Sequence, residues 1–489
     1  MGTTIPANRA SFTIEEVLAA TGGTLVQRGA ATVVGISTDT RRLQRGNAFV
    51  ALRGESFDGH EHVAAACKAG AALVVASRAV EAGDGTAVVQ VSDTLEALGA
   101  LARAHKRRWV KEAKAGGRDA AVVAVTGSAG KTTTCRAIRS VLEQVAPSAV
   151  HSGAGNLNNA VGVPMVLLGL EPSHRFAVIE IGTSSPGEIA YGVSMTEPDV
   201  SVLTLVSCAH AQGLGSIEGV AREKGAIYGL LGRDGTAVVN GDDKLAREQW
   251  SRADAGNKIA YGRFADADVR IVVQELEGAE TQRLGYEVRR AGNRVLVQAR
   301  VPLLGDAGAY ACGAALAVQL ALFGDQFDRA AATRGLEAIQ GEERRLRPRE
   351  LRSGVLLIDD AYNANPASMA DSVRTAAAMA RQLKRRLVLV LGEMRELGRY
   401  AAEEHAALGR IAYESGAAKL IAVAGAAADT AKSAASLGLA SEFVDNSRLA
   451  AALACTAIGR GDIALVKGSR GVALERVVEA LEAQGGGAS

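Results

Sequence analysis

Short aliphatic, β-branched runs alternate with longer amphipathic stretches along most of this chain. In the first hundred residues, strand patterns lie at 32–36, 48–52, 72–76 and 87–91, and helical patterns at 14–20, 63–69 and 94–114. In the centre, strand patterns lie at 122–125, 176–181, 200–205 and 236–239, with helical stretches between them. Because the apolar period changes repeatedly from that of a strand to that of a helix, the pattern predicts βαβ units and parallel sheets.

After Gly262 the pattern changes. Apolar and polar residues alternate at period two over 269–276, 285–290 and 294–302, which predicts an antiparallel side-sheet. From Val355 strand and helix alternate again. Strands are predicted at 355–358, 387–391, 420–423 and 463–466, and helices at 368–383, 401–414, 426–435, 447–458 and 472–483. This order predicts a second doubly wound α/β domain.

Two breaks divide the pattern into three parts. The first is the polar, glycine-containing run 116–119, and the second is the arginine-rich segment 341–352, which we interpret as a hinge. We therefore predict an α/β protein of three domains: a small α/β domain (1–116), a central parallel-sheet ATPase-type domain (117–341) and a Rossmann-like domain (342–489). The length of 489 residues agrees with this number, since domains commonly have ~100–200 residues. The glycine-rich end, 485–489, is expected to be frayed.

The composition is that of an ordinary globular protein, with 48% hydrophobic and 22% charged residues. A net charge of +2 and only 4% aromatic residues provide no argument for a nucleic-acid partner. No apolar run reaches the ~18 residues of a membrane-spanning helix, and no signal peptide is evident. The five cysteines are scattered, so we expect reduced thiols and a cytoplasmic enzyme without a membrane partner.

The strongest chemical motif is the run Val122-Val-Ala-Val-Thr-Gly-Ser-Ala-Gly-Lys-Thr-Thr-Thr134. A strand, a glycine loop and a helix start in this order are typical of a phosphate-binding loop, where backbone N–H groups converge on an anion. Lys131 would reach terminal phosphate oxygens, and the Thr132 hydroxyl is placed to bind Mg²⁺. The predicted nucleotide-binding residues are Gly127, Ser128, Ala129, Gly130, Lys131, Thr132 and Thr133. The alternative is a glycine-rich βα turn with a surface lysine.

Two further side chains follow strands that would lie beside this loop. Glu180 ends the strand 176–179, and His210 follows the strand 200–206. Ligands bind beyond the carboxyl ends of strands in open α/β sheets, so Thr132, Glu180 and His210 predict an Mg²⁺ shell completed by water. The alternatives are a buried, paired carboxylate for Glu180 and a helix cap for His210. Lys224 lies on a predicted helix, where an ordinary lysine is exposed.

Two polar loops stand out in the first domain. Ser37-Thr-Asp-Thr-Arg-Arg42 and Gly54-Glu-Ser-Phe-Asp-Gly-His60 each follow a predicted strand. Hydroxyls and arginines in such a position suit a phosphate or a sugar, and Asp58-Gly59-His60 suits a ribose or a base. Taken alone, either loop is also compatible with a solvated turn.

Together these motifs resemble those of the Mur ligases of peptidoglycan synthesis. Most of all they resemble the branch that joins D-alanyl-D-alanine to UDP-N-acetylmuramoyl-tripeptide. The matching motifs are the two polar loops, Thr126–Thr132, Gly155-Asn-Leu-Asn-Asn159 with Gly162–Pro164, Glu180-Ile-Gly182, Ala209-His210 with Gly215-Ser216, Lys224-Gly225, Asp359-Asp-Ala-Tyr-Asn-Ala-Asn-Pro366, Leu391-Gly-Glu-Met-Arg-Glu-Leu-Gly398 and Val466-Lys-Gly-Ser-Arg470. The run from Asp359 to Pro366 distinguishes this branch from its sister ligases.

The resemblance implies that the first domain holds the UDP end of a nucleotide-sugar peptide, the second binds ATP, and the third closes over both. It implies catalytic roles for Lys131, Glu180, His210 and Lys224. Lys224 would be carbamylated by CO₂ and help to hold a second Mg²⁺, which requires a partly buried lysine of low pKa. The further nucleotide-binding residues implied are Asp359, Asp360 and Asn363. The substrate-binding residues implied are Ser37, Thr38, Asp39, Arg41, Asp58, Gly59, His60, Asn158, Asn159, Tyr362, Asn365, Lys467, Ser469 and Arg470.

The implied reaction is ATP-dependent amide ligation through an acyl phosphate. Two alternatives stay open: a sister ligase that uses another amine, and a non-catalytic nucleotide-binding homologue. We expect a monomer, although nothing in the sequence sets the oligomeric state or the diamino acid at the third peptide position.

The chain departs from the family pattern at three places. Ser184-Ser185 stands where Asn-His is usual, Gln212 where glutamate is usual, and Gly305-Asp-Ala-Gly-Ala309 with Ala311 where Gly-x-His-Asn and a further Asn are usual. The first two bear on how the peptide carboxylate is held. The third removes side chains expected near the adenosine.

Overall fold

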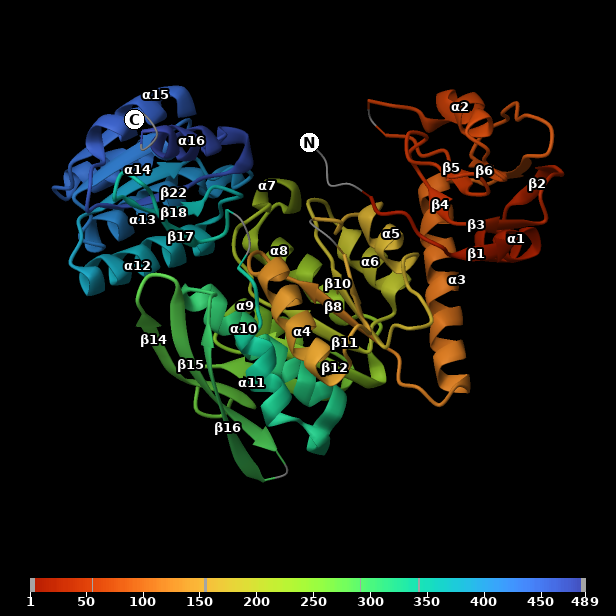
Figure 1. Cartoon of the computed structure of the whole chain (residues 1–489), viewed down its shortest axis with the longest axis horizontal. Helices are drawn as coiled ribbons and strands as arrows, with labels where there is room; N and C mark the ends of the chain where they lie inside the picture. Colours follow the sequence, from red (N-terminus) through yellow and green to blue (C-terminus); the bar gives the residue numbers. More distant parts are fainter. Residues whose placement is uncertain (1–4, 55, 154–155, 291, 342–343, 485–489) are drawn as a thin grey trace.

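The computed structural model describes residues 5–54, 56–153, 156–290, 292–341 and 344–484. Within these ranges the chain forms an N-terminal part, a central part and a C-terminal part, with the central part between the other two (Figure 1). Glu55, Gly155, two residues of the proposed hinge (342–343) and the end 485–489 carried predictions but lie outside the described residues. The predicted limits at 116 and 341 stay predictions.

The N-terminal part is built on a five-stranded sheet in the order β2-β7-β6-β5-β4. Its strands are β2 (Thr24–Gln27), β7 (Ala87–Gln90), β6 (Leu73–Ala76), β5 (Ala48–Val50) and β4 (Ile36–Ser37). Strands β4 to β7 are parallel, and β2 is antiparallel to β7. A separate pair joins β1 (Ser11–Thr13) to β3 (Thr32–Val34). The sequence pattern missed β1 and β2, because both are short and partly exposed.

Three helices accompany this sheet: α1 (Ile14–Thr21), α2 (Val63–Lys68) and α3 (Thr94–Ala115). Helix α3 packs against α1 and also against α5 (Gly162–Leu167) and α6 (Glu188–Thr196) of the central part. The basic run in α3 is engaged at this junction, since Lys106 and Arg107 both pair with Glu197. This basic run therefore helps to hold the N-terminal part against the central part.

The central part contains a nine-stranded sheet in the order β16-β15-β14-β13-β12-β11-β8-β10-β9. Its strands are β8 (Ala121–Thr126), β9 (Val150–Ser152), β10 (Phe176–Glu180), β11 (Val200–Leu203), β12 (Gly232–Asn240), β13 (Ala255–Gly262), β14 (Val269–Glu277), β15 (Thr281–Arg290) and β16 (Asn293–Val301). The last three strands are antiparallel, as predicted, but they do not form a separate sheet. Strand β14 pairs in parallel with β13, so the antiparallel strands extend the main sheet.

Alternate residues of β8 face two different helical layers. Val123 and Val125 pack with α4 (Lys131–Val145), α10 (Gly305–Phe323) and α11 (Arg329–Glu337). Val122 and Ala124 belong to the core that includes α5 and α6. Helices α7 (Ala211–Leu214), α8 (Ile217–Gly225) and α9 (Lys244–Ser251) complete the central part. Among the described residues, the helix and turn at 305–326 are long and apolar enough to cross a membrane by length and composition alone. However, 61% of the 18-residue apolar window within this segment is buried, and the core helix of a soluble protein meets the same criteria of length and composition.

The C-terminal part is a six-stranded sheet in the order β17-β18-β22-β19-β20-β21. Its strands are β17 (Arg347–Glu350), β18 (Leu356–Asp360), β19 (Leu387–Gly392), β20 (Lys419–Val423), β21 (Ser441–Val444) and β22 (Ile463–Lys467). Its helices are α12 (Pro366–Leu383), α13 (Ala401–Glu414), α14 (Ala427–Ser436), α15 (Ser447–Ala457) and α16 (Glu475–Ala483). All strands are parallel except β17, which pairs antiparallel with β18. Strand β17 lies inside the segment interpreted as a hinge, so part of that segment belongs to the sheet.

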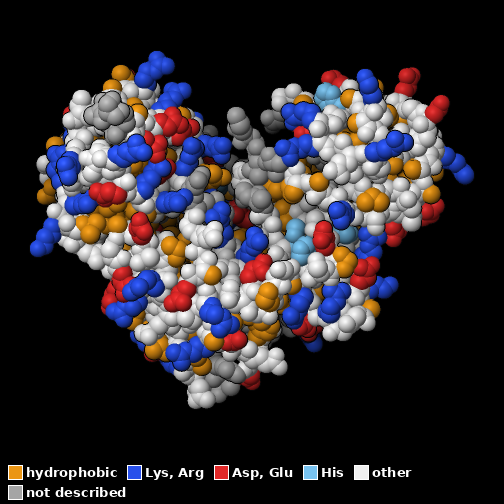
Figure 2. Space-filling view, viewed as in Figure 1, with side chains coloured by type: hydrophobic (Ala, Val, Ile, Leu, Met, Phe, Trp, Pro, Cys, Tyr) orange, Lys and Arg blue, Asp and Glu red, His pale blue; other side chains and the backbone are white. Residues whose placement is uncertain are grey.

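The space-filling view is hollowed between the N-terminal and C-terminal parts (Figure 2). On the face shown there, acidic and basic side chains are interspersed, in keeping with the net charge of +2. The five cysteines are free, as predicted.

We predict that Leu316→Ala destabilises the central part by about 2–5 kcal/mol, because Leu316 is fully buried in α10 and truncation leaves a cavity. Trp250 donates to Ala237 O of β12, so in a Trp109→Phe background, which removes the other tryptophan, fluorescence during urea unfolding reports on this part. Leu449→Ala is the control, since Leu449 is 49% exposed on α15. Equal effects of the two substitutions would contradict the assignment of α10 to the core.

Candidate active site

The predicted phosphate-binding loop connects β8 to α4. Gly127 has a φ of 153° and Gly130 a φ of 80°, and both lie where a side chain is disfavoured. A Cβ at Gly127 would also lie 1.9 Å from Thr204 Oγ1 on the neighbouring strand's extension. Helix α4 begins at Lys131, and the first N–H groups of a helix lack intrahelical acceptors. The loop therefore has the geometry of an anion site at a helix N-terminus.

Lys131 lies within this loop and is half-buried. Its ammonium donates to Gly127 O at 2.9 Å, so the side chain curls back over the loop. Burial lowers the pKa of Lys131, nearby Glu180 opposes that shift, and nearby Arg345 adds to it. The side chain is thus placed over the site where phosphates are expected, and the alternative of a solvated surface lysine does not fit.

A cavity of about 1680 Å³ extends from this loop to the C-terminal part. Its walls include the predicted residues Ser128, Ala129, Gly130, Lys131, Thr132, Thr133, Asn158, Asn159, Glu180, His210, Asp359, Asp360, Tyr362, Asn363, Asn365 and Lys467. The structure therefore brings most of the predicted nucleotide site and part of the predicted substrate site to one cavity between two parts of the fold.

Glu180 stands at the end of β10, directly beside the loop. Thr132 Oγ1 donates to its Oε2 at 2.8 Å, and Asn158 Nδ2 donates to its Oε1 at 2.6 Å. Both carboxylate oxygens are oriented by neutral donors, and the side chain remains half-buried on the cavity wall. This arrangement leaves the negative charge of Glu180 available to a cation in the cavity.

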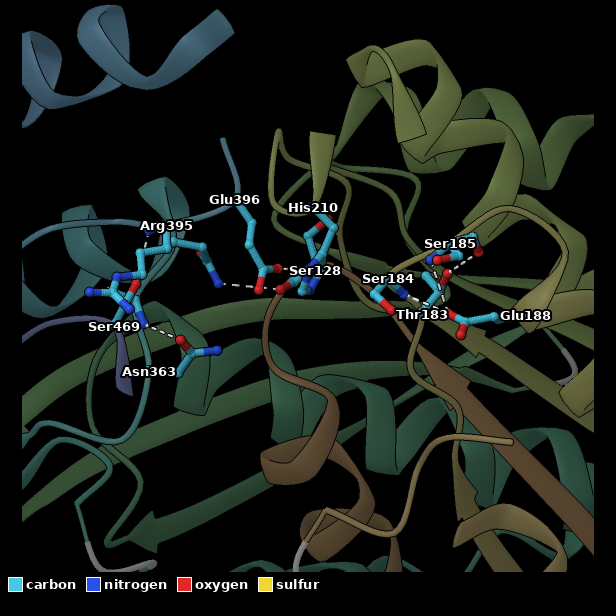
Figure 3. A network of polar contacts seen from close by, with 12 residues as sticks. Ser128, Thr183, Ser184, Ser185, Glu188, His210, Asn363, Arg395, Glu396 and Ser469 are labelled. Carbon is cyan, nitrogen blue, oxygen red and sulfur yellow. Dashed lines mark hydrogen bonds and ion pairs between the residues drawn. The ribbon is translucent and has the colours of Figure 1, made fainter. Parts of the chain in front are cut away.

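His210 occupies a left-handed backbone conformation, with a φ of 62°. It is the N-cap residue of α7, as the helix-cap alternative expected, but its side chain makes no capping hydrogen bond. Its Nδ1 instead contacts Glu396 Oε2 of the C-terminal part (Figure 3). Burial is the main cause of the lowered pKa of His210; Glu396 opposes this shift, and Lys224 and Lys131 add to it. A neutral imidazole is the form that can bind a metal ion.

Lys224 is fully buried in α8, which contradicts the expectation of an exposed helical lysine. Its Nζ has no hydrogen-bond partner among the described residues. Burial, followed by the charge of Lys131, lowers the pKa of Lys224 to about 7. Lys224 is not among the described residues that line the cavity, so it lies behind the cavity wall.

Across the described residues, His, Cys, Asp and Glu side chains form no group of three or more that would hold a metal ion. Thr132, Glu180 and His210 nevertheless fit Mg²⁺, which retains several waters and is usually bound by one or two carboxylates together with substrate phosphates. The amine of Lys224, which has no hydrogen-bond partner among the described residues, also fits a metal site, because a carbamate formed on it would place an anion at this position. The donor set thus suits a metal ion that is bound together with a phosphate ligand.

Two of the predicted C-terminal residues bind each other. Lys467 donates to Asp360 Oδ2 at 2.6 Å and to Asn363 O at 3.1 Å, and Ser372 Oγ also donates to Asp360 Oδ2. Asp359 lies beside this pair, and burial raises its pKa. This buried group supports the cavity wall next to the nucleotide site.

Other predicted C-terminal residues contact the central part or each other. Asn365 caps α12 and donates from Nδ2 to Ser128 O of the phosphate-binding loop at 3.2 Å. The guanidinium Cζ of Arg345 lies 4.4 Å from the centroid of the Tyr362 ring, and that of Arg470 lies 5.7 Å from it. Ser469 Oγ accepts from Arg395 N, outside the main cavity.

Sequence reasoning missed two residues that the fold brings to this site. Arg345 Nη2 lies 3.2 Å from Thr132 Oγ1, and Glu396 contacts His210. Arg345 lies in the arginine-rich segment that was interpreted only as a hinge. Glu396 belongs to a motif that was recognised without a role for this carboxylate. Neither contact has a sequence signal, because the partners are 186 and 213 residues apart.

The N-terminal loops form a second polar group, away from the cavity. They follow the parallel strands β4 and β5, and Ser77 follows the neighbouring strand β6. Asp58 Oδ1 lies 2.6 Å from His60 Nδ1, and His60 Nε2 accepts from Ser77 N at 2.9 Å. Asp39 accepts from Arg41, and Ser37 Oγ donates to Asp39 O. Ser37, Thr38, Asp39, Arg41, Asp58, Gly59 and His60 are absent from the described walls of the main cavity.

The three departures from the family pattern also have structural positions. Ser184 and Ser185 donate from their backbone N–H groups to Glu188 (Figure 3). Gln212 lies at the contact with Glu396. In place of the expected side chains at 305–311, Asp371 of α12 accepts from Asp306 N and Ala307 N at 2.8 and 3.1 Å.

Comparison with known proteins connects all three parts of the chain to one family. Residues 32–106 match the model of the Mur ligase family catalytic domain, 125–319 the Mur ligase middle domain, and 344–470 the Mur ligase glutamate ligase domain. The chain is 33% identical to the UDP-N-acetylmuramoyl-tripeptide–D-alanyl-D-alanine ligase of Escherichia coli, over 93% of this chain and 95% of that protein. The Bacillus subtilis protein of the same name is also 33% identical, over 96% and 98%.

Solved structures agree with this relationship. A crystal structure of MurF from Acinetobacter baumannii has a TM-score of 0.85 at 30% identity, covering 97% of this chain and 100% of that one. The MurF ligase of Thermotoga maritima in complex with ADP has a TM-score of 0.77 at 25% identity, covering 92% and 97%. The chain belongs to the Mur ligase family, and it lies among relatives named UDP-N-acetylmuramoyl-tripeptide–D-alanyl-D-alanine ligase.

Proposed function

We propose that this protein is an ATP-dependent ligase that joins D-alanyl-D-alanine to UDP-N-acetylmuramoyl-tripeptide in peptidoglycan precursor synthesis. The observation that carries this proposal is the likeness over nearly the whole length to relatives of that name. The loop from Gly127 to Thr133 beside Glu180, facing a cavity shared with the C-terminal part, supports ATP as the second substrate. A cytoplasmic location, a monomeric state and the absence of nucleic-acid and membrane partners remain predictions from the sequence.

The chemistry is an acyl activation followed by an amide-forming step. The terminal carboxylate of the tripeptide attacks the γ-phosphorus of ATP, which yields an acyl phosphate and ADP. The dipeptide amine then attacks the acyl carbon, and inorganic phosphate leaves from the tetrahedral intermediate. Lys131 and the N–H groups at the start of α4 offset the negative charge of the transferring phosphoryl group.

Thr132, Glu180 and His210 would hold Mg²⁺, which neutralises phosphate charge when it is bound. We assign a second Mg²⁺ to a carbamate on Lys224. The neutral amine attacks the carbon of CO₂ and loses one proton, which leaves an anionic carbamate. An amine with a pKa of about 7 and no hydrogen-bond partner among the described residues is suited to this reaction.

We assign the remaining substrate contacts by region. The loops at Ser37–Arg41 and Asp58–His60 would hold the UDP end, and Asn158 and Asn159 the peptide. Asp359, Asp360 and Asn363 would complete the nucleotide site from the C-terminal part. Tyr362, Asn365, Lys467, Ser469 and Arg470 would bind the incoming amine substrate. In these assignments the UDP-peptide spans the predicted domains 1–116 and 117–341, ATP lies between 117–341 and 342–489, and the incoming amine lies on 342–489.

Lys131→Ala is expected to lower ligation by roughly 10²–10³-fold, the loss typical of removing one donor to developing negative charge. ADP release measures the activity, and thermal unfolding checks that the fold is retained. Lys114→Ala, at an exposed position near the end of α3, is the control. Near-normal turnover of the Lys131 variant would contradict its role at the phosphates.

Lys224→Ala is expected to be nearly inactive and to be partly rescued by small carboxylates, which supply the missing anion. Because only the neutral amine reacts with CO₂ and the pKa is about 7, carbamate formation in the wild type should increase as the pH is raised from about 6 to 8. A ¹³C NMR signal after incubation with ¹³CO₂ measures the carbamate directly. Full activity in CO₂-free buffer, without that signal, would rule the carbamate out.

The identity of the amine can be tested with purified protein, ATP, Mg²⁺ and UDP-N-acetylmuramoyl-tripeptide. We expect D-alanyl-D-alanine to be coupled with a kcat/KM about 10- to 100-fold higher than that of free D-alanine. This is the difference expected when a charge-assisted hydrogen bond to the far carboxylate is lost. Mass spectrometry of the product distinguishes the two adducts. A single-residue adduct would indicate a sister ligase, and ATP binding without product would indicate a non-catalytic homologue.

A further inference from the structure

The strongest feature that remains unassigned is the contact between His210 and Glu396. His210 belongs to the central part and lines the main cavity, whereas Glu396 follows β19 in the C-terminal part. Their side chains point toward each other across the boundary between the two parts (Figure 3). Among the described residues, Glu396 is the one that hydrogen-bonds to the His210 ring, so it is the group that orients the ring.

This contact is the centre of a small interface. Gln212 N donates to Glu396 O at 3.2 Å, Ile217 N donates to the Tyr400 hydroxyl at 3.4 Å, and Cys208 Sγ donates to Glu404 Oε1 at 3.3 Å. On the central side, the interface residues lie between 208 and 217, on both sides of α7. On the C-terminal side, they lie between 396 and 404. The contact is therefore part of the docking of the two parts.

The backbone at both partners is unusual. His210 has a φ of 62° and Glu396 a φ of 64°, and residues with a Cβ seldom adopt this conformation. A Cβ on Gly398, which also has a positive φ of 55°, would lie 3.3 Å from Gln212 Cα. The two chains thus approach closely, and the surrounding structure holds both residues in conformations that aim their side chains at each other.

The chemistry of the pair determines the state of the imidazole. An ionised carboxylate can only accept hydrogen bonds, so the contact with Glu396 requires the proton to be on His210 Nδ1. The lone pair is then on Nε2, the ring nitrogen that Glu396 leaves unoccupied. Histidines that bind metal ions commonly donate their other ring N–H to a carboxylate, which fixes the tautomer and the orientation of the ring. Here that carboxylate comes from the opposite side of a domain boundary.

We propose that Glu396 is a positioning residue that completes the metal site from the C-terminal part, by fixing the tautomer and orientation of His210 when the two parts dock. The proposal rests on the proposed function, which makes His210 a ligand of Mg²⁺. It couples domain docking to metal binding. The metal ion is held well only after the part that delivers the amine substrate has closed, so phosphoryl transfer is disfavoured in the open form.

The test is the affinity for Mn²⁺, a spectroscopic substitute for Mg²⁺, measured by electron paramagnetic resonance with a non-hydrolysable ATP analogue bound. Glu396→Ala is expected to weaken Mn²⁺ binding about 10- to 100-fold, the usual effect of removing a partner of a metal-binding histidine. Glu396→Gln should recover most of the loss, because the amide oxygen still accepts from Nδ1–H. In a His210→Ala background, Glu396→Ala should have no further effect.

Tyr400→Phe is the matched control, because it removes a hydrogen bond of the same interface without touching His210. Small-angle scattering on the same samples reports the docked fraction. We expect Tyr400→Phe to leave both the docked fraction and the Mn²⁺ affinity within about twofold of the wild type, because it removes one contact of the interface and leaves the contact between Glu396 and His210 in place.

Two results would overturn the proposal: unchanged Mn²⁺ affinity in Glu396→Ala, or equal losses in Tyr400→Phe and Glu396→Ala, which would reduce Glu396 to a docking contact. The product assay with the wild-type protein tests the proposed function separately. If no product forms in that assay, the proposed reaction is wrong. The Mn²⁺ titration decides the role of Glu396 whatever the amine substrate is.

Discussion

The parallel register of β8, β10 and β11 is the constraint on which the site depends. Glu180 pairs with Val125, and Leu203 pairs with Thr126, so both neighbouring strands end where the phosphate-binding loop begins. Side chains that follow these strands therefore meet at one edge of the sheet. A shift of one residue in β10 would turn Glu180 away from Thr132, because successive residues of a strand face opposite sides.

Around this edge the protein accumulates buried positive charge. Lys131 and Lys224 each lower the pKa of groups near them, and Arg345 adds a third cation close to Thr132. Burying cations is costly unless anions accompany them, and Glu180 supplies only one negative charge. A triphosphate would supply the rest. In our proposal a carbamate on Lys224 adds further negative charge. The electrostatics of this site therefore favour the binding of anions.

The C-terminal part reaches the site at several separate places. Asn365 contacts the phosphate-binding loop, Asp371 accepts from the start of α10, and the residues from Glu396 to Glu404 dock beside α7. Burial raises the pKa of Asp371 to about 6. Since these contacts surround the cavity, the arrangement described here is a docked one, in which both parts contribute to a single set of walls.

The sequence by itself determined the class of the fold, most helices and strands, and the phosphate-binding loop with Glu180 and His210 nearby. These features rest on local periods, on glycines that need positive φ, and on the rule that ligands bind at strand ends. It did not predict β1, β2, β9, β13, β17 and β21, which are short, exposed, at an edge or outside a clear apolar period. It placed the antiparallel strands in a separate sheet, because strand pairing between β13 and β14 leaves no mark in the apolar pattern.

Tertiary structure alone decided the environment of individual side chains. Lys224 lies on a helix with no unusual local pattern, yet its packing buries it completely and lowers its pKa. Lys467 and Asp360 were predicted to have separate roles, but adjacent parallel strands bring them into one buried ion pair. The contacts of Arg345 with Thr132 and of Glu396 with His210 join residues 213 and 186 positions apart. Such pairs form only when separate parts of the fold dock. A sequence pattern shows which face of a helix or strand is buried, but not which other helix or strand packs against that face.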